Sequence, residues 1–78
     1  MKGSIEDRHK LQKDIGKRIR EIRNQRDVSL STLSANCHMD KPNLSKLETG
    51  KTNPTLYMLK RIADYFEISL SELLDFDS

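Results

Sequence analysis

Two short helices joined by a tight turn are predicted by residues 29–51, SLSTLSANCHMDKPNLSKLETGK. The first helix begins after Ser29, a residue type that is favoured at helix N-caps, and the turn falls near His38. The second helix begins after Asp40 and stops at Gly50, because glycine adopts most easily the left-handed conformation that ends many helices. The rest of the chain must supply the surfaces against which this pair packs.

The second helix of the pair has a packed side and a free side. At about 100° per residue, Leu44, Leu47 and Glu48 share one side, which we expect to face the core. The opposite side is polar and carries cations but no carboxylate. Such a face is typical of a helix that reads DNA, and it is equally compatible with the solvated face of a small helical bundle.

An amphipathic helix is predicted from about Lys13 to Asp27, because residues of one face recur at helical spacing. That face consists of Leu11, Ile15, Ile19, Ile22 and Arg26. Arg23 lies at its edge, where a half-buried guanidinium requires a partner. Glu48 also lies on a packed side and has no cation beside it there. We therefore predict an ion pair between Arg23 and Glu48 that joins the two helices.

Two more helices complete a predicted all-α fold. Pro54 and Thr55 mark the start of a helix that runs from Leu56 to about Phe66. Its core-facing stripe is predicted to consist of Leu56, Leu59, Ile62, Ala63 and Phe66. A last short helix is predicted by the capping box Ser69-Leu70-Ser71-Glu72. We therefore expect five helices, with residues 1–12 forming a flexible or partly helical extension and residues 13–78 forming one domain.

Charge is distributed unevenly along the 78 residues. All 14 lysines and arginines fall within the first 61 positions together with seven acids, whereas the last 17 positions hold five acids and no base. A segment of charge +7 followed by a tail of −5 favours a basic face that meets phosphates. A charged surface that serves only solubility is the competing interpretation.

Several other classes of function are disfavoured by composition. The single cysteine, Cys37, excludes an internal disulfide, and with His9 and His38 it offers too few ligands for a metal, so no metal or cofactor is expected. No apolar run reaches the roughly 18 residues of a membrane-spanning helix. We expect a cytoplasmic protein without membrane contact or an evident small-molecule ligand. Cys37 and His38 point apart and lack an orienting carboxylate, so enzymatic activity is not expected and Cys37 should be buried.

An ordered set of residues runs through most of the chain. It comprises Ile15-Gly16-Lys17-Arg18-Ile19-Arg20, Arg23, Ser29-Leu30-Ser31-Thr32-Leu33, Leu44-Ser45-Lys46-Leu47-Glu48-Thr49-Gly50-Lys51, Pro54-Thr55-Leu56, Leu59, Ile62, Ala63 and Ile68-Ser69. In this order the residues resemble the Xre-type, lambda-repressor-like (Cro/C1-type) helix-turn-helix regulators. The resemblance implies a compact five-helix domain whose second and third helices form the helix-turn-helix, with Arg23 and Glu48 as the family's structural pair.

The resemblance also implies where DNA is contacted. Base contacts would come from the recognition helix, about residues 41–49, through Lys41, Pro42, Asn43 and Lys46. Phosphate contacts would come from Ser29, Thr49, Lys51, Thr52 and Asn53. The chain departs from the family pattern at Leu30, where many members have glutamine, and at Ser34, where alanine is usual. It also has His38 in place of the turn glycine, so His38 is expected to adopt a left-handed conformation.

The expected function is sequence-specific binding of double-stranded DNA by a transcriptional regulator, either a repressor or an autoregulator. Proteins of this kind commonly act as homodimers on two-fold symmetric operators. The expected dimer interface consists of Met58, Tyr65, Leu70, Leu74 and Phe76, unless Tyr65 and Phe76 only cap the core. The alternative is a protein-binding adaptor or antitoxin-type module that uses the same fold.

Overall fold

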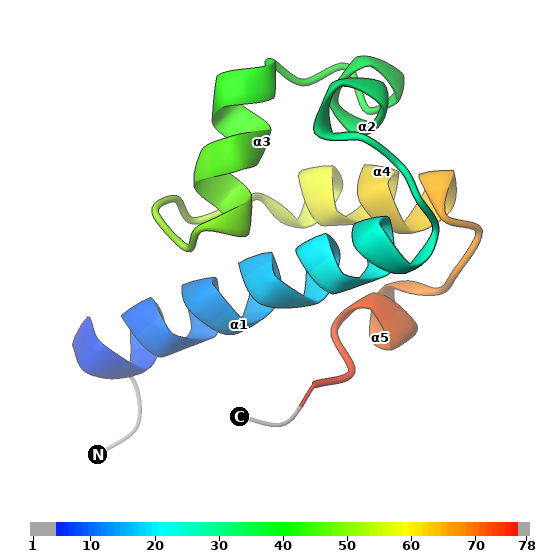
Figure 1. Cartoon of the computed structure of the whole chain (residues 1–78). Coiled ribbons are helices and arrows are strands. Elements are labelled where there is room, and N and C mark those ends of the chain that lie inside the picture. Colours follow the sequence, from blue (N-terminus) through cyan, green and yellow to red (C-terminus); the bar gives the residue numbers. More distant parts are fainter. Residues whose placement is uncertain (1–4, 77–78) are drawn as a thin grey trace.

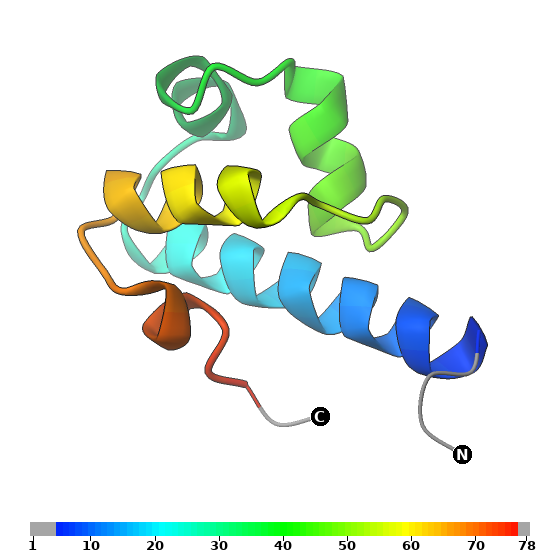
Figure 2. The ribbon, with the colours of Figure 1, turned by 180° about the vertical axis from the view of Figure 1, so that it is seen from behind.

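The computed structural model describes residues 5–76, and this part of the chain forms five α-helices. They are α1 (Ile5–Gln25), α2 (Leu30–Asn36), α3 (Lys41–Glu48), α4 (Leu56–Tyr65) and α5 (Leu70–Leu73). The helices α2 and α3 stand above α1, while α4 runs beside α1 and α5 lies below α4 (Figures 1 and 2). The predicted all-α architecture, with a helix-turn-helix in α2 and α3, is confirmed.

Short-range sequence signals set the starts of the helices. Ser29, Thr55 and Ser69 each accept a hydrogen bond at the side-chain oxygen from the backbone amide three residues further on. Glu72 completes the predicted capping box with Ser69. Asp40 occupies the N-cap position of α3, as predicted, but its side chain makes no capping hydrogen bond.

The first four helices are each followed by a residue with positive φ. These residues are Asp27 (54°), His38 (55°), Gly50 (75°) and Glu67 (59°). The left-handed conformation was predicted for His38 and Gly50 and is confirmed at both. Asp27 and Glu67 adopt it as well, and at these two positions the sequence contains no glycine that would have indicated it.

The helix α1 differs from the predicted helix at both ends. It stops at Gln25 rather than Asp27, and it begins at Ile5, so residues 5–12 of the expected extension are helical; residues 1–4 lie outside the described part. Leu11 was placed on the buried face, but its side chain is 51% exposed. The reason is that the first turns of α1 project beyond the helices that cover the rest of it (Figure 1).

The core is built from small and medium-sized apolar side chains of all five helices and the turns that follow them. It consists of Ile15, Ile19, Ile22, Leu33, Cys37, Leu44, Leu47, Leu59, Ile62, Ala63, Phe66 and Leu73. Cys37 is 2% exposed, so its predicted place at the end of the α2 stripe is confirmed. One ring, that of Phe66, fills the space that the aliphatic residues leave.

Arginine side chains from other elements close the carboxyl ends of three helices. Arg18 donates to two carbonyl oxygens at the end of α5, at 2.8 and 3.3 Å. Arg26 donates to the carbonyl oxygen of Phe66, which follows α4. Arg61 Nε donates to the carbonyl oxygen of Cys37, which follows α2, at 3.1 Å. Cations at these ends satisfy free carbonyl groups and complement the helix dipole. These three arginines are therefore structural.

Candidate nucleic-acid interface

The two sides of α3 are separated as its sequence predicts. Leu44 and Leu47 are fully buried and Glu48 is 8% exposed. The four residues expected to contact bases, Lys41, Pro42, Asn43 and Lys46, are all exposed. The carboxyl end of α3 is seated on α1, while its amino end points away from the body of the molecule (Figure 1). The structure thus leaves the polar side of α3 uncovered.

Arg23 fixes the position of α3 through its buried carboxylate. Its Nε donates to Glu48 Oε2 at 2.8 Å and its Nη2 donates to Glu48 Oε1 at 2.9 Å. Its Nη1 donates to the carbonyl oxygen of Val28 at 3.0 Å, just before α2. The hydrogen bond to Glu48 raises the pKa of Arg23, although burial opposes this shift. The predicted pair is present, and it joins α1, α3 and the approach to α2.

Gly16 lets the backbones of α1 and α3 touch. A Cβ atom at this position would lie 2.2 Å from the carbonyl oxygen of Leu47 and 2.7 Å from that of Glu48. Glycine in a helix interior normally costs about 0.5–1 kcal/mol relative to alanine, so it needs a structural reason. The ordered residue pattern includes Gly16 but does not explain it. A glycine within an otherwise regular helix is the sequence signal that indicates a close contact there.

The predicted phosphate-contacting residues lie at the start of α2 and around the end of α3. Lys51 and Asn53 are exposed in the turn after α3, and Thr52 is half-buried there. Ser29 is exposed, but its hydroxyl caps α2. The hydroxyl of Thr49 donates to two carbonyl oxygens of α3. Lys51 and Asn53 therefore retain side-chain donors that an anion can accept, whereas Thr49 uses its proton within the helix.

Internal bonds divide the cations of the described residues into two groups. The engaged group consists of Arg18, Arg23, Arg26 and Arg61, together with Lys10 and Lys60, which pair with acids four residues further on. Lys41, Lys46 and Lys51 are exposed and make no ion pair with another described residue. The positive charge on α3 and its following turn is thus available to a ligand.

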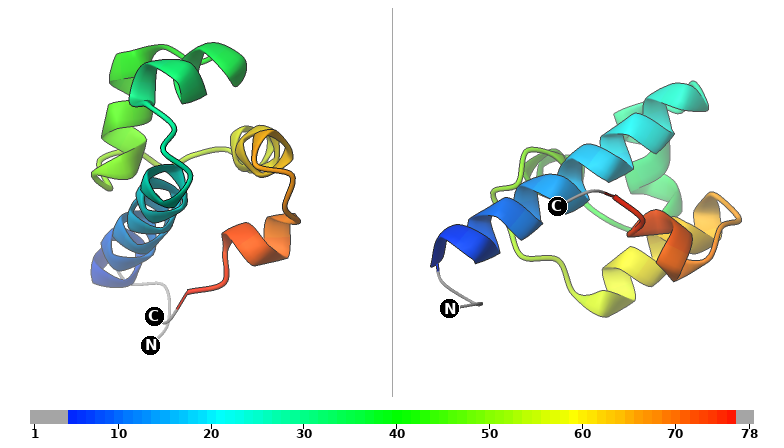
Figure 3. Two further views of the ribbon diagram at one scale, coloured as in Figure 1. Left: turned by 45° about the vertical axis from the view of Figure 1, so that its right-hand side comes forward. Right: turned by 90° about the horizontal axis from the view of Figure 1, so that it is seen from below.

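The residues expected at a dimer interface are mostly part of the monomer's own packing. Tyr65, Leu70, Leu74 and Phe76 are partly buried against the core, and Met58 is half-buried. The most exposed apolar side chains of α4 are instead those of Leu56 and Tyr57, each 66% exposed. Leu56 was placed on the core-facing stripe, which is wrong because the first turn of α4 extends past the neighbouring helices (Figure 3).

Within residues 5–76, no helix is both long and apolar enough to cross a membrane, and side chains of the described part form no cluster suited to a metal ion. A shallow surface depression of about 440 Å³ lies between α2 and α4. It is lined by Asn36, Tyr57, Lys60, Arg61, Asp64 and Tyr65. Its charged groups bond to one another or to the backbone, since Lys60 pairs with Asp64 and Arg61 bonds to Tyr57 and to the end of α2.

A family model described as Helix-turn-helix matches residues 19–73, which is most of the chain. Together with the five-helix fold and the exposed α3, this match defines the class of protein. The chain belongs to the Xre-type, lambda-repressor-like helix-turn-helix family, as the ordered residue pattern predicted.

Individual relatives agree with this assignment. The chain is 37% identical over 62 residues to the HTH-type transcriptional regulator SlrR of Bacillus subtilis (strain 168), covering 78% of this chain and 41% of SlrR. It is 36% identical over 58 residues to the HTH-type transcriptional regulator DdrOP3 of Deinococcus deserti, covering 74% of this chain and 45% of DdrOP3. The chain therefore spans less than half the length of either relative.

A solved structure extends the likeness to three dimensions. The restriction-modification controller protein C.AhdI from Aeromonas hydrophila is similar to this chain with a TM-score of 0.77 and 27% sequence identity. The match covers 80% of this chain and 94% of C.AhdI. The arrangement of the helices is thus shared over nearly the whole of a small regulator of comparable extent.

Proposed function

We propose that this chain is a sequence-specific module for binding double-stranded DNA in a transcriptional regulator, and that α3 enters the major groove. The observation that carries this proposal is the two-sidedness of α3. Its buried side is held to α1 through Arg23 and Glu48, while its exposed side presents lysines and an asparagine without a carboxylate. Membership of the helix-turn-helix family and the transcriptional regulators among its relatives support the same function.

The exposed side of α3 carries donors suited to base edges. Lys41 and Lys46 can donate to guanine O6 and N7, and Asn43 can pair with the N6 and N7 edge of adenine. Pro42 has no backbone donor, so we assign it contact with a thymine methyl group or a role in shaping the helix start. Leu30 at the start of α2 has no polar group for base contact, and the specificity is therefore assigned to α3.

Phosphates would be held on both sides of the recognition helix. Lys51, Thr52 and Asn53 lie in the turn that follows α3, where Lys51 supplies a full positive charge. Ser29 is the N-cap of α2, whose first backbone amides would donate to an approaching anion. Thr49 at the C-cap of α3 would join them by exchanging the hydrogen bonds that its hydroxyl makes within the helix for one to a phosphate. These contacts would position the protein on the duplex without reading its sequence.

We further propose that the protein works as a homodimer on a two-fold symmetric operator, as a repressor or autoregulator in the cytoplasm. The interface would involve Met58, Tyr65, Leu70, Leu74 and Phe76, extended by the exposed Leu56 at the start of α4. Sedimentation should show a dimer, alone or on DNA, and Leu56→Lys should weaken it. A monomer at tens of micromolar in both conditions would contradict the dimer proposal.

Selection of bound duplexes from a random DNA pool tests the function directly. We expect enrichment of one sequence with two inverted half-sites about one helical turn apart. Asn43→Ala and Lys46→Ala should weaken binding to the enriched duplex by about 1–3 kcal/mol, and binding to random duplex less. Lys51→Ala should weaken both and make the salt slope shallower by about one unit for each bound protomer. Folded protein that enriches no sequence would refute sequence-specific binding and favour the adaptor function.

A further inference from the structure

One edge of α1 carries exposed cations that make no ion pair with another described residue. Lys13 and Arg20 are both exposed, and being seven residues apart they lie on nearly the same line along the helix, within about 20° of each other. Gly16 lies between them and contacts the backbone of α3. On the same helix, Arg18 and Arg23 are committed to internal hydrogen bonds. Lys13 and Arg20 therefore flank the contact between α1 and α3.

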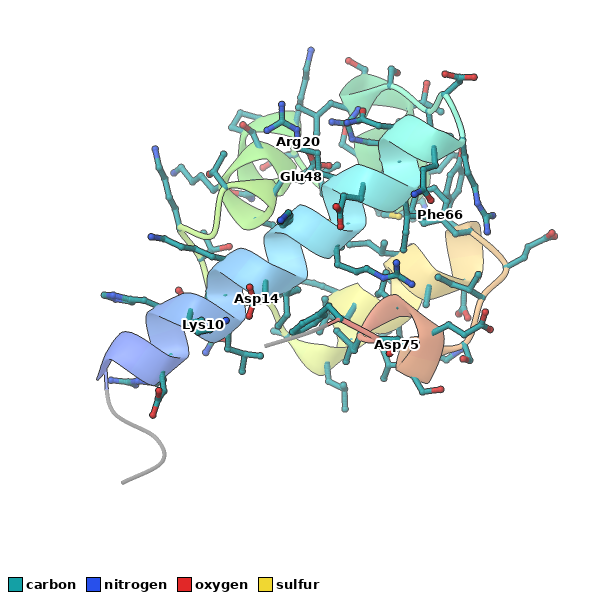
Figure 4. All side chains as sticks on the ribbon, turned by 60° about the horizontal axis from the view of Figure 1, so that its bottom comes forward. Lys10, Asp14, Arg20, Glu48, Phe66 and Asp75 are labelled. Carbon is teal, nitrogen blue, oxygen red and sulfur yellow. The ribbon has the colours of Figure 1, made fainter. Side chains whose placement is uncertain are left out.

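Asp14 and Glu21 lie on a different side of α1, about 80–120° around the helix from Lys13 and Arg20. Figure 4 shows Arg20 on the side of α1 that borders α3, whereas Lys10 and Asp14 lie on the side that faces the viewer. Asp14 forms an ion pair with Lys10 at 3.0 Å. Asp14 and Glu21 both line a groove beside Asp75 and Phe76. The edge of α1 that borders α3 thus keeps the positive charges of Lys13 and Arg20, whereas on the other side Lys10 and Asp14 neutralise each other.

Lys13 is placed directly against the turn that follows α3. Gly50 approaches it so closely that a Cβ on Gly50 would lie 2.8 Å from Lys13 Cα and 2.6 Å from Lys13 Cγ. The next residue is Lys51, which the proposed function assigns to a phosphate. Lys13 therefore lies at the same corner of the molecule as Lys51, which is expected to contact the DNA backbone.

We propose that Lys13 and Arg20 form a second phosphate-binding edge that contacts the DNA backbone beside the groove occupied by α3. This inference rests on the proposed function. Seven residues of α-helix span about 10 Å along the axis, so the two cations can reach different phosphates. Each phosphate that they neutralise releases condensed counterions, which strengthens binding without regard to sequence. The helix α1 then both supports the recognition helix and contributes affinity of its own.

The test compares two variants that lose the same charge. Lys13→Gln with Arg20→Gln removes the edge, and glutamine retains the Cγ that packs on Gly50. Lys10→Gln with Lys60→Gln removes two lysines that are paired with carboxylates. Anisotropy titrations with the selected duplex and with random duplex are made from about 50 to 200 mM salt. The edge variant should make the negative slope of log K against log salt shallower by about two units for each bound protomer, equally on both duplexes, and the paired-lysine control should leave it near the wild-type value.

Several results would overturn this inference. A wild-type slope in the edge variant, or the same loss in the paired-lysine control, would show that the edge makes no specific contribution. A greater loss on the selected duplex than on random DNA would place these residues in base recognition instead. Should the double variant be unfolded by circular dichroism, Arg20→Gln alone must make the slope shallower by about one unit for each bound protomer. Wild-type protein that binds no duplex refutes the proposed function itself, which is a distinguishable outcome.

Discussion

Arg23 in α1 and Glu48 in α3 are 25 residues apart in the sequence and form a bidentate ion pair, with N–O distances of 2.8 and 2.9 Å. The side chain of Glu48 is 5% exposed and that of Arg23 is 14% exposed. The third donor of Arg23 reaches the carbonyl oxygen of Val28. A single guanidinium therefore sets how α3 leaves the body of the domain.

Removing this guanidinium should strand a buried carboxylate. We expect Arg23→Met to lower the free energy of unfolding by about 3–5 kcal/mol in urea titrations. Arg23→Met combined with Glu48→Met should recover part of the loss, because an apolar pair is often no less stable than a buried ion pair. Lys17→Met, at an exposed position of the same helix, is the control. A loss below about 1 kcal/mol for Arg23→Met would show that the pair is only a surface interaction.

The pH dependence of this pair follows from the raised pKa of Arg23. A base whose pKa is higher in the folded state adds stability at every pH below its unfolded value and loses it only as the pH rises through the folded value. The contribution from Arg23 should therefore stay constant between about pH 6 and 9, since arginine ionises far above that range.

Gly16→Ala should destabilise the protein, although glycine-to-alanine changes within helices normally stabilise them. The added Cβ would meet the carbonyl oxygens of Leu47 and Glu48, which belong to rigid backbone. We expect a loss of about 1–3 kcal/mol in thermal or urea unfolding, as for other overpacked contacts. Asn24→Ala, at an exposed position of α1, should be neutral or stabilising. A gain in stability for Gly16→Ala would contradict the close approach of α1 and α3.

Glycine should be favourable at the left-handed residues that follow helices. Glu67 has a φ of 59°, and Glu67→Gly should raise the free energy of unfolding by about 0.5–1 kcal/mol. The gains at Asp27 and His38 should be smaller, because aspartate and histidine tolerate positive φ better than glutamate does. Glu21→Gly, within α1, should instead cost about 1 kcal/mol. Equal losses at positions 67 and 21 would argue against the strained conformation.

The buried thiol of Cys37 should make stability fall at alkaline pH. Burial raises the pKa of Cys37, and the charge of Arg61 lowers it by less. The unfolded chain therefore loses this proton first, and stability contributed by the neutral thiol is lost as the pH rises above about 8.5. Unfolding titrations from about pH 7.5 to 9.5 should show a decline that Cys37→Ala reduces. Native protein should also resist alkylation at pH 8; rapid labelling would show that the thiol is accessible.

Most of the helix boundaries and the central ion pair could be predicted because their signals are local or periodic. Ser29 as a cap, Ser69 with Glu72 as a capping box, and Gly50 as a helix stop each depend on residues within one turn. The two sides of α3 follow from the 3.6-residue period of the helix, and so does the inward placement of Glu48. The DNA-contacting residues inferred from the family pattern stay predictions, although their exposure on α3 agrees with that role.

Long-range packing decided the features that this local information does not contain. Leu11 and Leu56 fit apolar stripes, yet they are exposed because both lie in helix turns that extend past their neighbours. From the sequence alone, Arg18 could belong to a basic surface. In the fold, its guanidinium instead donates to two carbonyl oxygens at the end of α5. Residue type and helical period thus determined the elements and their inward faces, whereas the meeting of separate helices decided which residues are covered, which cations are free and where a glycine is required. The physical reason is that burial and charge neutralisation depend on atoms contributed by distant parts of the chain.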